Sequence, residues 1–375
     1  MRGSALKLPR ITTVAGLTLA GALALTGCGS DDNGTGSASS DTGSGDSLTG
    51  TLNGEGSTAQ KNAIEQAISA FGDANPGATV NYNPTGSGAG IKQFNAKQVD
   101  FAGSDSALKT EAVDGVVEAD AAKTRCGGND AWNLPMVASP IAVAYNLPGV
   151  DKVILTPSVI SKMFLGSIKT WDDPAIKALN PAASLPSTAI KVFFRSDESG
   201  TTENFQKYLS GSAPKDWTQA PSKVWPGKVG EGRAKTDGVS EGVKTTEGGL
   251  GYLDWSAARD NKLGVASVDN GGGAVTLDAE TAGAALTAAQ PAGTGNDLRL
   301  KLDYSTKDPG TYPIVLVTYE IVCSKGLDAG KTTLLKSFLT SFASASTQSS
   351  LESIGFAPLP AEIQTKVKTA IDAIS

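Results

Sequence analysis

The chain has 375 residues, a net charge of −6 at neutral pH and no histidine. Its acidic balance argues against general nucleic-acid binding, which depends on basic surface. The absence of histidine excludes Ser-His-Asp and Cys-His catalysis and imidazole metal ligands, so no catalytic residue, metal site or cofactor is predicted.

The first 27 residues have the pattern of a secretory signal. Arg2, Lys7 and Arg10 precede an apolar run over residues 11–27, at the lower edge of the length of a membrane-spanning helix. The run ends in Leu-Thr-Gly before Cys28, which resembles the lipobox of bacterial lipoproteins, whose cysteine is acylated. The alternative is an ordinary secretory signal followed by an unrelated cysteine. We predict a signal peptide over residues 1–27 and a lipid anchor on Cys28, at the extracytoplasmic face of the cell membrane.

Residues 28–47 are predicted to form a flexible tether. After Cys28 they are nearly all Gly, Ser, Thr, Asp and Asn, which cannot bury apolar surface. Flexible-chain scaling gives such a segment a root-mean-square reach of roughly 25 Å. Removal of the signal leaves 348 residues with a net charge near −9, which is long enough for two domains.

Beyond the tether, short strands alternate with helices. In the first part, strands are predicted over residues 48–52, 79–82 and 99–102, and helices over 59–71 and from the glycine-rich turn at 86–90 through 98. Further on, we predict a helix-rich stretch over 157–179, a strand over 190–194, and helices over 201–209, 332–345 and 360–374. This alternation predicts an α/β fold.

Two long apolar runs, residues 136–145 and 312–323, lie far apart in the sequence. The simplest arrangement is two lobes that the chain crosses twice, with these runs as the crossings. It assigns residues 48–137 and 313–375 to lobe I and residues 138–312 to lobe II.

Cys126 and Cys323 lie just before the first crossing and just after the second. In an oxidising compartment two such cysteines are a candidate disulfide, and the alternative is two free buried thiols. We favour the bridge, which would join the two halves of lobe I.

Three segments place Ser or Thr beside Gly just before a helix: GEGST at 54–58, GSGAG at 86–90 and RSDESGTT at 195–202. A helix N-terminus offers unpaired N–H groups and a positive dipole end, glycine permits close approach, and hydroxyls add donors. One such turn is commonly only a helix cap, but three turns with Arg195, which can donate a forked pair of hydrogen bonds, predict an oxyanion site.

Asp105 follows the strand at 99–102 in a Gly-Ser turn. An ionised carboxylate only accepts hydrogen bonds, so in an anion site it favours an anion that carries a proton. Phosphate carries one near neutral pH and sulfate does not, so the carboxylate would reject sulfate. The alternative reading of Asp105 is a turn residue that caps the next helix.

These motifs resemble those of the phosphate-binding protein of the Pst-type phosphate ABC transporter. The resemblance covers nearly all of residues 48–375. It rests on the order and spacing of GEGSTAQ, GSGAGIKQF, VDFAGSD, WNLPMVASPIAVAYNLPG, GSIKTWDDPAI, RSDESGTT and GGLGYLDW. It implies a two-lobed periplasmic-binding-protein fold of type II, with two hinge crossings and a ligand cleft between the lobes. It also implies phosphate uptake through ABC permease subunits by a monomer that is not an enzyme.

The resemblance also implies the role of each ligand residue. Asp105 accepts the phosphate proton, and Arg195 forks onto the anion with Asp197 orienting it. The other phosphate-binding residues are Thr58, Ala59, Ser87, Ser199, Gly200 and Thr201, as hydroxyl or backbone donors. Ala59 departs from the family, because many relatives carry an aromatic residue there, and we expect a more open edge of the cleft at this position.

Several other readings are weaker. GLDAGKT at 326–332 has one residue too few between its glycines for a P-loop, and SALK at 106–109 lacks the partner motifs of penicillin-binding enzymes. The alternatives left open are a binder of another tetrahedral oxyanion (sulfate, molybdate or a phosphonate), an envelope hydrolase or phosphatase, and a surface protein that kept the fold.

Overall fold

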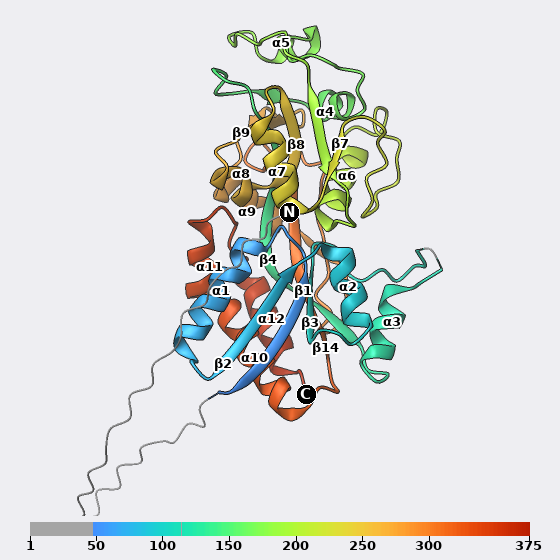
Figure 1. Ribbon diagram of the computed structural model, residues 1–375, viewed down its shortest axis with the longest axis vertical. Helices are drawn as coiled ribbons and strands as arrows, with labels where there is room; N and C mark the ends of the chain where they lie inside the picture. Colours follow the sequence, from blue (N-terminus) through green and yellow to red (C-terminus); the bar gives the residue numbers. More distant parts are fainter. Residues whose placement is uncertain (1–47, 114) are drawn as a thin grey trace, which may run out of the picture. The chain divides into compact units, whose positions relative to one another are not determined.

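The computed structural model describes residues 48–113 and 115–375 (Figure 1). The predicted signal peptide at 1–27, the lipidation site Cys28 and the tether at 28–47 lie outside the described residues. No helix of the described part is long and apolar enough to cross a membrane.

The chain opens with three parallel strands, as its alternating pattern predicted. Strand β1 (Gly50–Gly56) pairs in parallel with β2 (Ala78–Pro84) and β3 (Phe101–Ser104). Helices α1 (Lys61–Ala74) and α2 (Ser87–Asn95) connect them. α1 begins just after the turn at 54–58, and α2 begins within the turn at 86–90, so both turns lie at the carboxyl ends of parallel strands. Brought together at this edge of the sheet, their polar groups can form one site.

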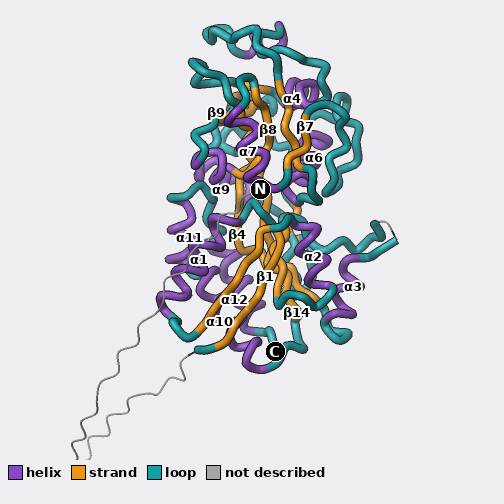
Figure 2. The backbone as a smooth tube through the Cα atoms, in the orientation of Figure 1, coloured by secondary structure: helices purple, strands orange, loops and turns teal. Residues whose placement is uncertain are grey.

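Two long strands extend the sheet beyond β3 (Figure 2). Residues 131–140 of β4 (Ala131–Tyr145) pair antiparallel with β14 (Val315–Cys323), which also pairs with β3. From Ile141 onward, β4 pairs instead with β8 (Gly249–Asp254), and its last two residues also pair with β9 (Gly264–Val265). The two apolar runs of the sequence are therefore adjacent strands, and β4 changes partner between Pro140 and Ile141.

The second part of the large sheet is built around β8. Strand β6 (Lys191–Arg195) pairs in parallel with β8 and with β7 (Glu231–Arg233). The sheet order is β2-β1-β3-β14-β4-β8-β6-β7. Helix α6 (Gly200–Ser212) follows β6 directly, and α7 (Lys235–Thr245) follows β7. The third glycine-hydroxyl turn thus lies between β6 and α6.

Shorter elements complete the described chain. The remaining strands are β5 (Ile154–Leu155), β10 (Ser267–Asp269), β11 (Ala274–Val275), β12 (Gln290–Pro291) and β13 (Leu300–Lys301). The remaining helices are α3 (Glu118–Arg125), α4 (Pro157–Phe164), α5 (Pro174–Leu179), α8 (Trp255–Asp260), α9 (Ala279–Thr287), α10 (Ala329–Phe342), α11 (Ala345–Glu352) and α12 (Ala361–Asp372).

Buried apolar side chains form separate clusters around the sheet. One cluster joins β1 and β2 to α1, α10 and α12, with Phe71, Phe101 and Phe338 in ring contact. A smaller cluster lies under α2 and α3, and Figure 1 shows these two helices on the opposite side of the strands from α1 and α10. The largest cluster contains the aromatic side chains Phe164, Phe205, Trp225 and Tyr252. Tyr252 stacks on Phe205 at 4.6 Å between ring centroids, which fixes its hydroxyl beside the third turn.

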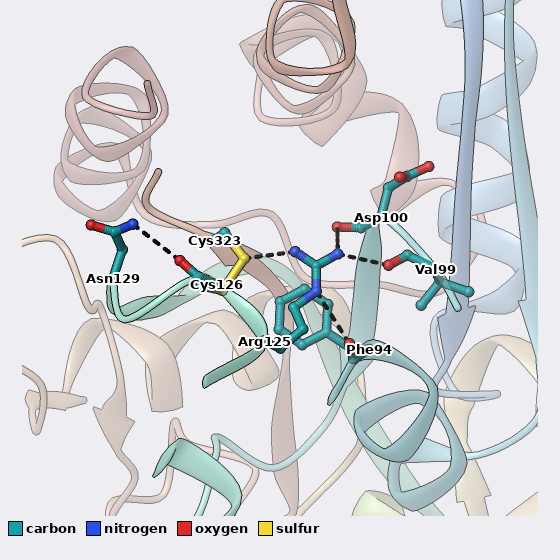
Figure 3. Close-up of a disulfide and its surroundings, with 7 residues drawn as sticks. All are labelled: Phe94, Val99, Asp100, Arg125, Cys126, Asn129 and Cys323. Carbon is teal, nitrogen blue, oxygen red and sulfur yellow. Dashed lines mark hydrogen bonds between the residues drawn. A yellow bond between two sulfur atoms is a disulfide. The ribbon is translucent and has the colours of Figure 1, made fainter. Parts of the chain in front are cut away.

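The predicted disulfide is confirmed. Cys126, just after α3, is bonded to Cys323 at the end of β14, with 5.4 Å between the Cα atoms (Figure 3). The neighbouring Arg125 donates from Nη1 to Sγ of Cys323 at 2.6 Å and from Nη2 to the carbonyl oxygen of Val99 at 2.8 Å. Its guanidinium also lies 4.2 Å from the ring centroid of Phe94. The bridge thus ties β14 to the end of α3, and Arg125 extends this junction to Phe94 of α2.

Removing the disulfide is expected to lower the free energy of unfolding by ~2–5 kcal/mol. The two cysteines are 197 positions apart, so the bridge restricts a very large loop in the unfolded chain. The Cys126→Ala/Cys323→Ala variant should unfold at lower denaturant concentration than the oxidised protein. The wild-type protein unfolded with a reductant is the matched control and should approach the variant. Equal stability of all three samples would contradict the prediction.

Candidate functional site

Asp105 is the centre of a cluster of hydroxyl groups. It follows β3 and is 3% exposed. Its Oδ1 accepts hydrogen bonds from Ser57 Oγ and, at 2.8 Å, from Thr318 Oγ1. Its Oδ2 accepts from Thr201 Oγ1 at 3.1 Å and more weakly from Ser87 Oγ at 3.4 Å. The four donors come from four separate segments of the chain, and all three glycine-hydroxyl turns contribute one.

The environment of Asp105 acts on its ionisation in two directions. Burial raises the pKa of Asp105 above its usual value, and the hydroxyl groups and the charge of Arg195 oppose this rise. A carboxylate offers about four acceptor positions, and the four hydroxyl donors occupy all of them. A new donor can therefore reach Asp105 only by replacing one of these hydroxyl groups.

The first turn approaches Asp105 through Ser57. Gly56 has a φ of 145°, and a side chain there would collide with the carbonyl oxygen of Gly103. The predicted ligand Thr58 lies at 2.9 Å from Thr236, measured between the two Oγ1 atoms, and accepts from the backbone N–H of Thr236 at 3.3 Å. The N–H of Ala59 donates to Ser57 Oγ at 3.1 Å. Ala59 itself is 1% exposed and belongs to the largest apolar cluster. The more open edge of the cleft at this position stays a prediction.

The second turn brings Ser87 to the cluster at the N-terminus of α2. Ser87 Oγ also accepts from the N–H of Asp105 at 3.2 Å. The preceding Gly86 has a φ of 110°, and a Cβ there would lie 2.5 Å from Oδ2 of Asp197. Glycine is therefore required where the second turn meets the Arg195 segment.

The third turn places Arg195 and Asp197 side by side, as the sequence predicted. Arg195 is 3% exposed and donates from Nε to Oδ1 of Asp197 at 2.8 Å and from Nη2 to Oδ2. Asp197 also accepts from the N–H of Lys235 at 2.9 Å. Burial opposes ionisation of Asp197, but the bonds and charge of Arg195 outweigh it, so the pKa of Asp197 lies below its usual value. Two of the five guanidinium N–H groups are occupied, and three remain for another acceptor.

The buried hydroxyl of Tyr252 holds the third glycine-hydroxyl turn in place by hydrogen bonds. It accepts from the backbone N–H of Arg195 at 3.2 Å and lies 2.7 Å from Oγ1 of Thr202. Burial raises the pKa of Tyr252 to about 12, so the hydroxyl stays protonated at neutral pH. The aromatic cluster of the core thereby sets the position of Arg195.

The start of α6 packs directly against Asp105. Ser199 caps the helix, with its Oγ accepting from the N–H of Thr202 at 3.2 Å. A Cβ on Gly200 would lie 2.7 Å from both Cβ of Asp105 and Oγ of Ser87, so glycine permits the approach. Asn204 donates to the carbonyl oxygen of Asp105 at 2.7 Å. The structure thus joins Ser87, Gly200 and Thr201 to Asp105 directly, whereas Thr58 is hydrogen-bonded to Thr236 in α7.

Four residues that take part in the hydrogen bonds of the site were not predicted from the sequence. Ser57 belongs to a quoted motif but was not given a role, and Asn204 is a single polar residue in a helix. Thr318 is one of the few polar residues in a mostly apolar strand, which is a signal that could have identified it. Thr236 follows a stretch with no strong periodicity, and nothing in the sequence indicated it.

Four ion pairs connect residues before 138 with residues of the 138–312 segment. They are Lys61–Asp237 at 3.0 Å, Lys92–Glu198 at 2.6 Å, Lys109–Glu203 at 2.5 Å and Lys223–Glu118 at 2.6 Å. Burial opposes ionisation of the Glu203 side chain, but Lys207 and Lys109 outweigh it and lower its pKa to about 2. A cavity of about 460 Å³ lies beside this pair and is lined by Asp105, Lys109, Glu203, Lys207, Arg299 and Tyr304, among others.

The described residues contain no group of three or more acidic or cysteine side chains placed to hold a metal ion. The polar groups of the site are therefore hydrogen-bond donors arranged around the Asp105 carboxylate and the Arg195 guanidinium. This arrangement suits a small oxyanion that can donate a proton.

Comparison with known proteins adds independent findings. A family model described as PBP superfamily domain matches residues 37–346. The chain is 44% identical to Phosphate-binding protein PstS 3 of Mycobacterium tuberculosis over 378 aligned positions, covering 99% of this chain and 100% of the relative. The Mycobacterium leprae protein of the same name is 43% identical with the same coverage.

Solved structures resemble this one as well. A high-affinity periplasmic phosphate-binding protein, PfluDING, solved with phosphate bound, has a TM-score of 0.67 at 21% identity, covering 85% of this chain and 93% of the other. Phosphate binding protein from Stenotrophomonas maltophilia has a TM-score of 0.63 at 19% identity, covering 86% and 94%. The predicted α/β, two-lobed periplasmic-binding-protein fold is confirmed.

Proposed function

Because this chain belongs to the PstS-type phosphate-binding proteins of the PBP superfamily, we propose that it binds inorganic phosphate outside the cell and delivers it to an ABC permease. The observation that carries the proposal is the position of Asp105, a buried carboxylate ringed by hydroxyl donors from all three turns. Such a group excludes most anions, but it can accept the proton that phosphate carries at neutral pH.

The two carboxylate oxygens of Asp105 have different hydrogen-bond partners, which suggests which of these bonds are exchanged when phosphate binds. Oδ1 is held by Ser57 and Thr318, which are outside the predicted ligand set. Oδ2 is held by Ser87 and Thr201, which are inside it. We propose that these two hydroxyl groups turn to phosphate oxygens on binding, and that the phosphate proton replaces them on Oδ2. The exchange replaces two hydroxyl donors, of which Ser87 is the weaker at 3.4 Å, by one phosphate donor.

Arg195 supplies the positive charge. Its Nε and Nη2 are aligned by Asp197, which leaves its remaining N–H groups to donate to two phosphate oxygens. The remaining proposed ligands are Thr58, Ala59, Ser199 and Gly200, with hydroxyl or backbone donors at helix starts. Ala59 N–H would have to leave Ser57 Oγ for the anion.

The lobe boundaries are part of the same proposal: residues 48–137 and 313–375 in lobe I, and 138–312 in lobe II. They are supported by the partner change of β4 between Pro140 and Ile141 and by the separate apolar clusters. Asp105 then belongs to lobe I and Arg195 to lobe II, so phosphate would hold the lobes together by hinge closure. The ion pairs between Lys61 and Asp237 and between Lys92 and Glu198 would form on closure.

The proposed cellular setting follows from the N-terminal sequence. A signal peptide at 1–27, an acyl anchor on Cys28 and a tether at 28–47 would keep a monomeric binder close to its permease and raise its effective concentration there. Labelling with a radioactive fatty acid should mark the wild-type protein and not a Cys28→Ser variant. Equal labelling of both would refute the anchor.

Binding without chemistry is also proposed. In the described residues the site offers no metal group, and the whole chain has no histidine to act as a base. Release of product from a chromogenic phosphate ester by the purified protein would support the hydrolase alternative instead.

Calorimetry tests the ligand directly. We expect one phosphate per chain at neutral pH, with an affinity at least roughly 10³-fold higher than that for sulfate. The expectation rests on the penalty that a site with an unsatisfied polar group imposes on the wrong ligand. Sulfate, molybdate and a phosphonate should be titrated under the same conditions. Comparable affinity for sulfate would refute the role of Asp105 and favour another oxyanion.

A further inference from the structure

The loop that carries Asp105 borders a cavity on one side. Residues 105–108 belong to no helix or strand, and all four line the cavity of about 460 Å³. Packing against the loop is incomplete there, so hydrogen bonds have to fix its backbone. Two buried asparagine side chains make such bonds. Asn204 on α6 donates to the carbonyl oxygen of Asp105, and Asn133 on β4 accepts from the N–H of the loop's last residue, Leu108.

Tyr304 fixes the orientation of the Asn204 amide. Nδ2 of Asn204 faces two carbonyl oxygens, that of Asp105 at 2.7 Å and that of Gly200 at 2.9 Å. Because carbonyl oxygens only accept hydrogen bonds, this end of the amide is the nitrogen, and Oδ1 of Asn204 needs a donor. The hydroxyl of Tyr304 donates to Oδ1 at 2.6 Å. Tyr304 therefore holds Asn204 in the orientation that reaches Asp105.

Asp297 fixes the second asparagine in the same way. Oδ1 of Asp297 accepts from Nδ2 of Asn133 at 2.7 Å and from the backbone N–H of Asn133 at 3.1 Å. An ionised carboxylate only accepts, so it selects the amide nitrogen and leaves Oδ1 of Asn133 for the N–H of Leu108 at 2.9 Å. Asn133 is 2% exposed, so water has little access to these groups.

Asp297 and Tyr304 lie at the two ends of one short segment, residues 297–304, which we call the strap. The first end is attached to β4 in proposed lobe I, where the N–H of Leu298 also donates to a backbone carbonyl oxygen at 3.1 Å. The last end is attached to α6 in proposed lobe II, where the carbonyl oxygen of Tyr304 accepts from Ser212 Oγ at 2.5 Å. The strap therefore binds both lobes, although the proposed boundaries assign all of it to lobe II.

We propose that the strap is a positioning element of the anion site, which spans both lobes and holds the loop at 105–108 through two hydrogen-bond chains. One chain runs from Tyr304 through Asn204 to Asp105. The other runs from Asp297 through Asn133 to the end of the loop. This inference rests on the proposed function, in which Asp105 accepts the phosphate proton, so a loop that is free to move binds phosphate more weakly.

Tyr304→Phe tests the first chain. It removes only the hydroxyl group, so the Asn204 amide is free to turn away from Asp105. Phosphate affinity at neutral pH, measured by calorimetry, should fall roughly fivefold, which is the size of one hydrogen bond. Tyr208→Phe is the matched control, because its hydroxyl donates to Asn270 at 3.2 Å and to no residue that binds the loop. Its affinity should stay within about twofold of the wild type.

A double-mutant cycle separates positioning from a general structural effect. Asn204→Ala removes the donor to the carbonyl oxygen of Asp105. If Tyr304 acts through Asn204, Tyr304→Phe should change the affinity of the Asn204→Ala protein by less than about twofold. A general loss of packing would instead lower the affinity by the same factor in both backgrounds.

Asp297→Ala tests the second chain. It should weaken phosphate binding roughly five- to tenfold, because two N–H groups of Asn133 lose their acceptor. Asp297→Asn keeps an acceptor oxygen and should restore the affinity to within about threefold of the wild type. Both variants lose the ion pair with Arg299 at 2.7 Å, so their difference reports the bonds to Asn133. Asp303→Ala, whose carboxylate accepts only from Ser305, is the control within the strap and should stay within about twofold.

The outcomes are distinct. Unchanged affinity of both Tyr304→Phe and Asp297→Ala beside a wild-type protein that binds phosphate would overturn the role of the strap and leave the proposed function intact. An equal loss from Tyr304→Phe with and without Asn204 would overturn it as well. Failure of the wild-type protein to bind phosphate would overturn the proposed function and this inference with it. Coupling between Tyr304 and Asn204, together with rescue by Asp297→Asn, would support both.

Discussion

Arg195→Ala is expected to weaken phosphate binding by about 10²- to 10³-fold. Arg195 is the buried cation of the proposed site, and Asp197 aligns it with two hydrogen bonds. A hydrogen bond to a charged group contributes ~1.5–3 kcal/mol, so the loss of two removes ~3–4 kcal/mol or more. The variant also leaves Asp197 without its partner beside an incoming anion, which adds repulsion. Calorimetry or a fluorescence titration of the purified variant measures the change.

Arg233 provides a matched control for Arg195. It lies on the adjacent strand β7 in register with Arg195 and pairs with Glu231 at 3.0 Å. Arg233→Ala removes the same charge nearby, and its phosphate affinity should stay within about threefold, as for an exposed pair. Arg195→Lys should be intermediate, because a lysine keeps the charge but not the planar fork. An unchanged affinity of Arg195→Ala would show that Arg195 lies outside the site.

Asp105→Asn is expected to weaken phosphate by about 10²-fold and to reduce the preference over sulfate. Asparagine keeps the shape of the side chain, but its amide group donates where Oδ2 accepts. The phosphate proton then meets a donor, whereas the repulsion of sulfate by the carboxylate is gone. The ratio of the two affinities, measured by calorimetry at neutral pH, is the decisive quantity, because a general loss of folding would lower both.

Asp100 is the matched control for Asp105, since the two residues flank β3 at opposite ends. Asp100 pairs with Lys331 at 2.5 Å and accepts from the N–H of Asn53 at 2.9 Å. Asp100→Asn should leave both phosphate affinity and selectivity unchanged within about twofold, with at most a small loss of stability. If Asp105→Asn kept full discrimination against sulfate, selectivity would have to arise from another part of the cage.

The regular elements were predictable where local pattern decides them. The helices at α1, α2 and α6 follow glycine-hydroxyl turns, and their positions agree with the sequence to within a few residues. The first crossing was placed too late: β4 begins at Ala131 and not at residue 136. Pro135 lies inside this strand and pairs with Tyr319 beside a register shift between β4 and β14, where a proline is tolerated.

The site was predictable in its motifs and not in its long-range partners. Ser87, Asp105 and Arg195 stand in short segments whose residue types indicate their chemistry. Thr318 bonds to Asp105, 213 positions away in the sequence, and Thr236 bonds to Thr58, 178 positions away. No local sequence pattern indicates a contact between residues so far apart. α7 and α8 were not predicted from the sequence, and both pack against β8. Tertiary contacts decided these features, as they commonly do when propensity is weak.

The place of β14 in the sheet has a consequence for how the protein is made. β14 lies between β3 and β4, yet it is encoded after residue 314. Until that stretch has been synthesised, β3 and β4 have no shared neighbour, and the sheet cannot be completed. Such distant strand pairing slows folding. On the proposed export route this delay would be useful, because the core of a chain that crosses a membrane as an extended polymer would assemble only after nearly all of it had emerged on the far side.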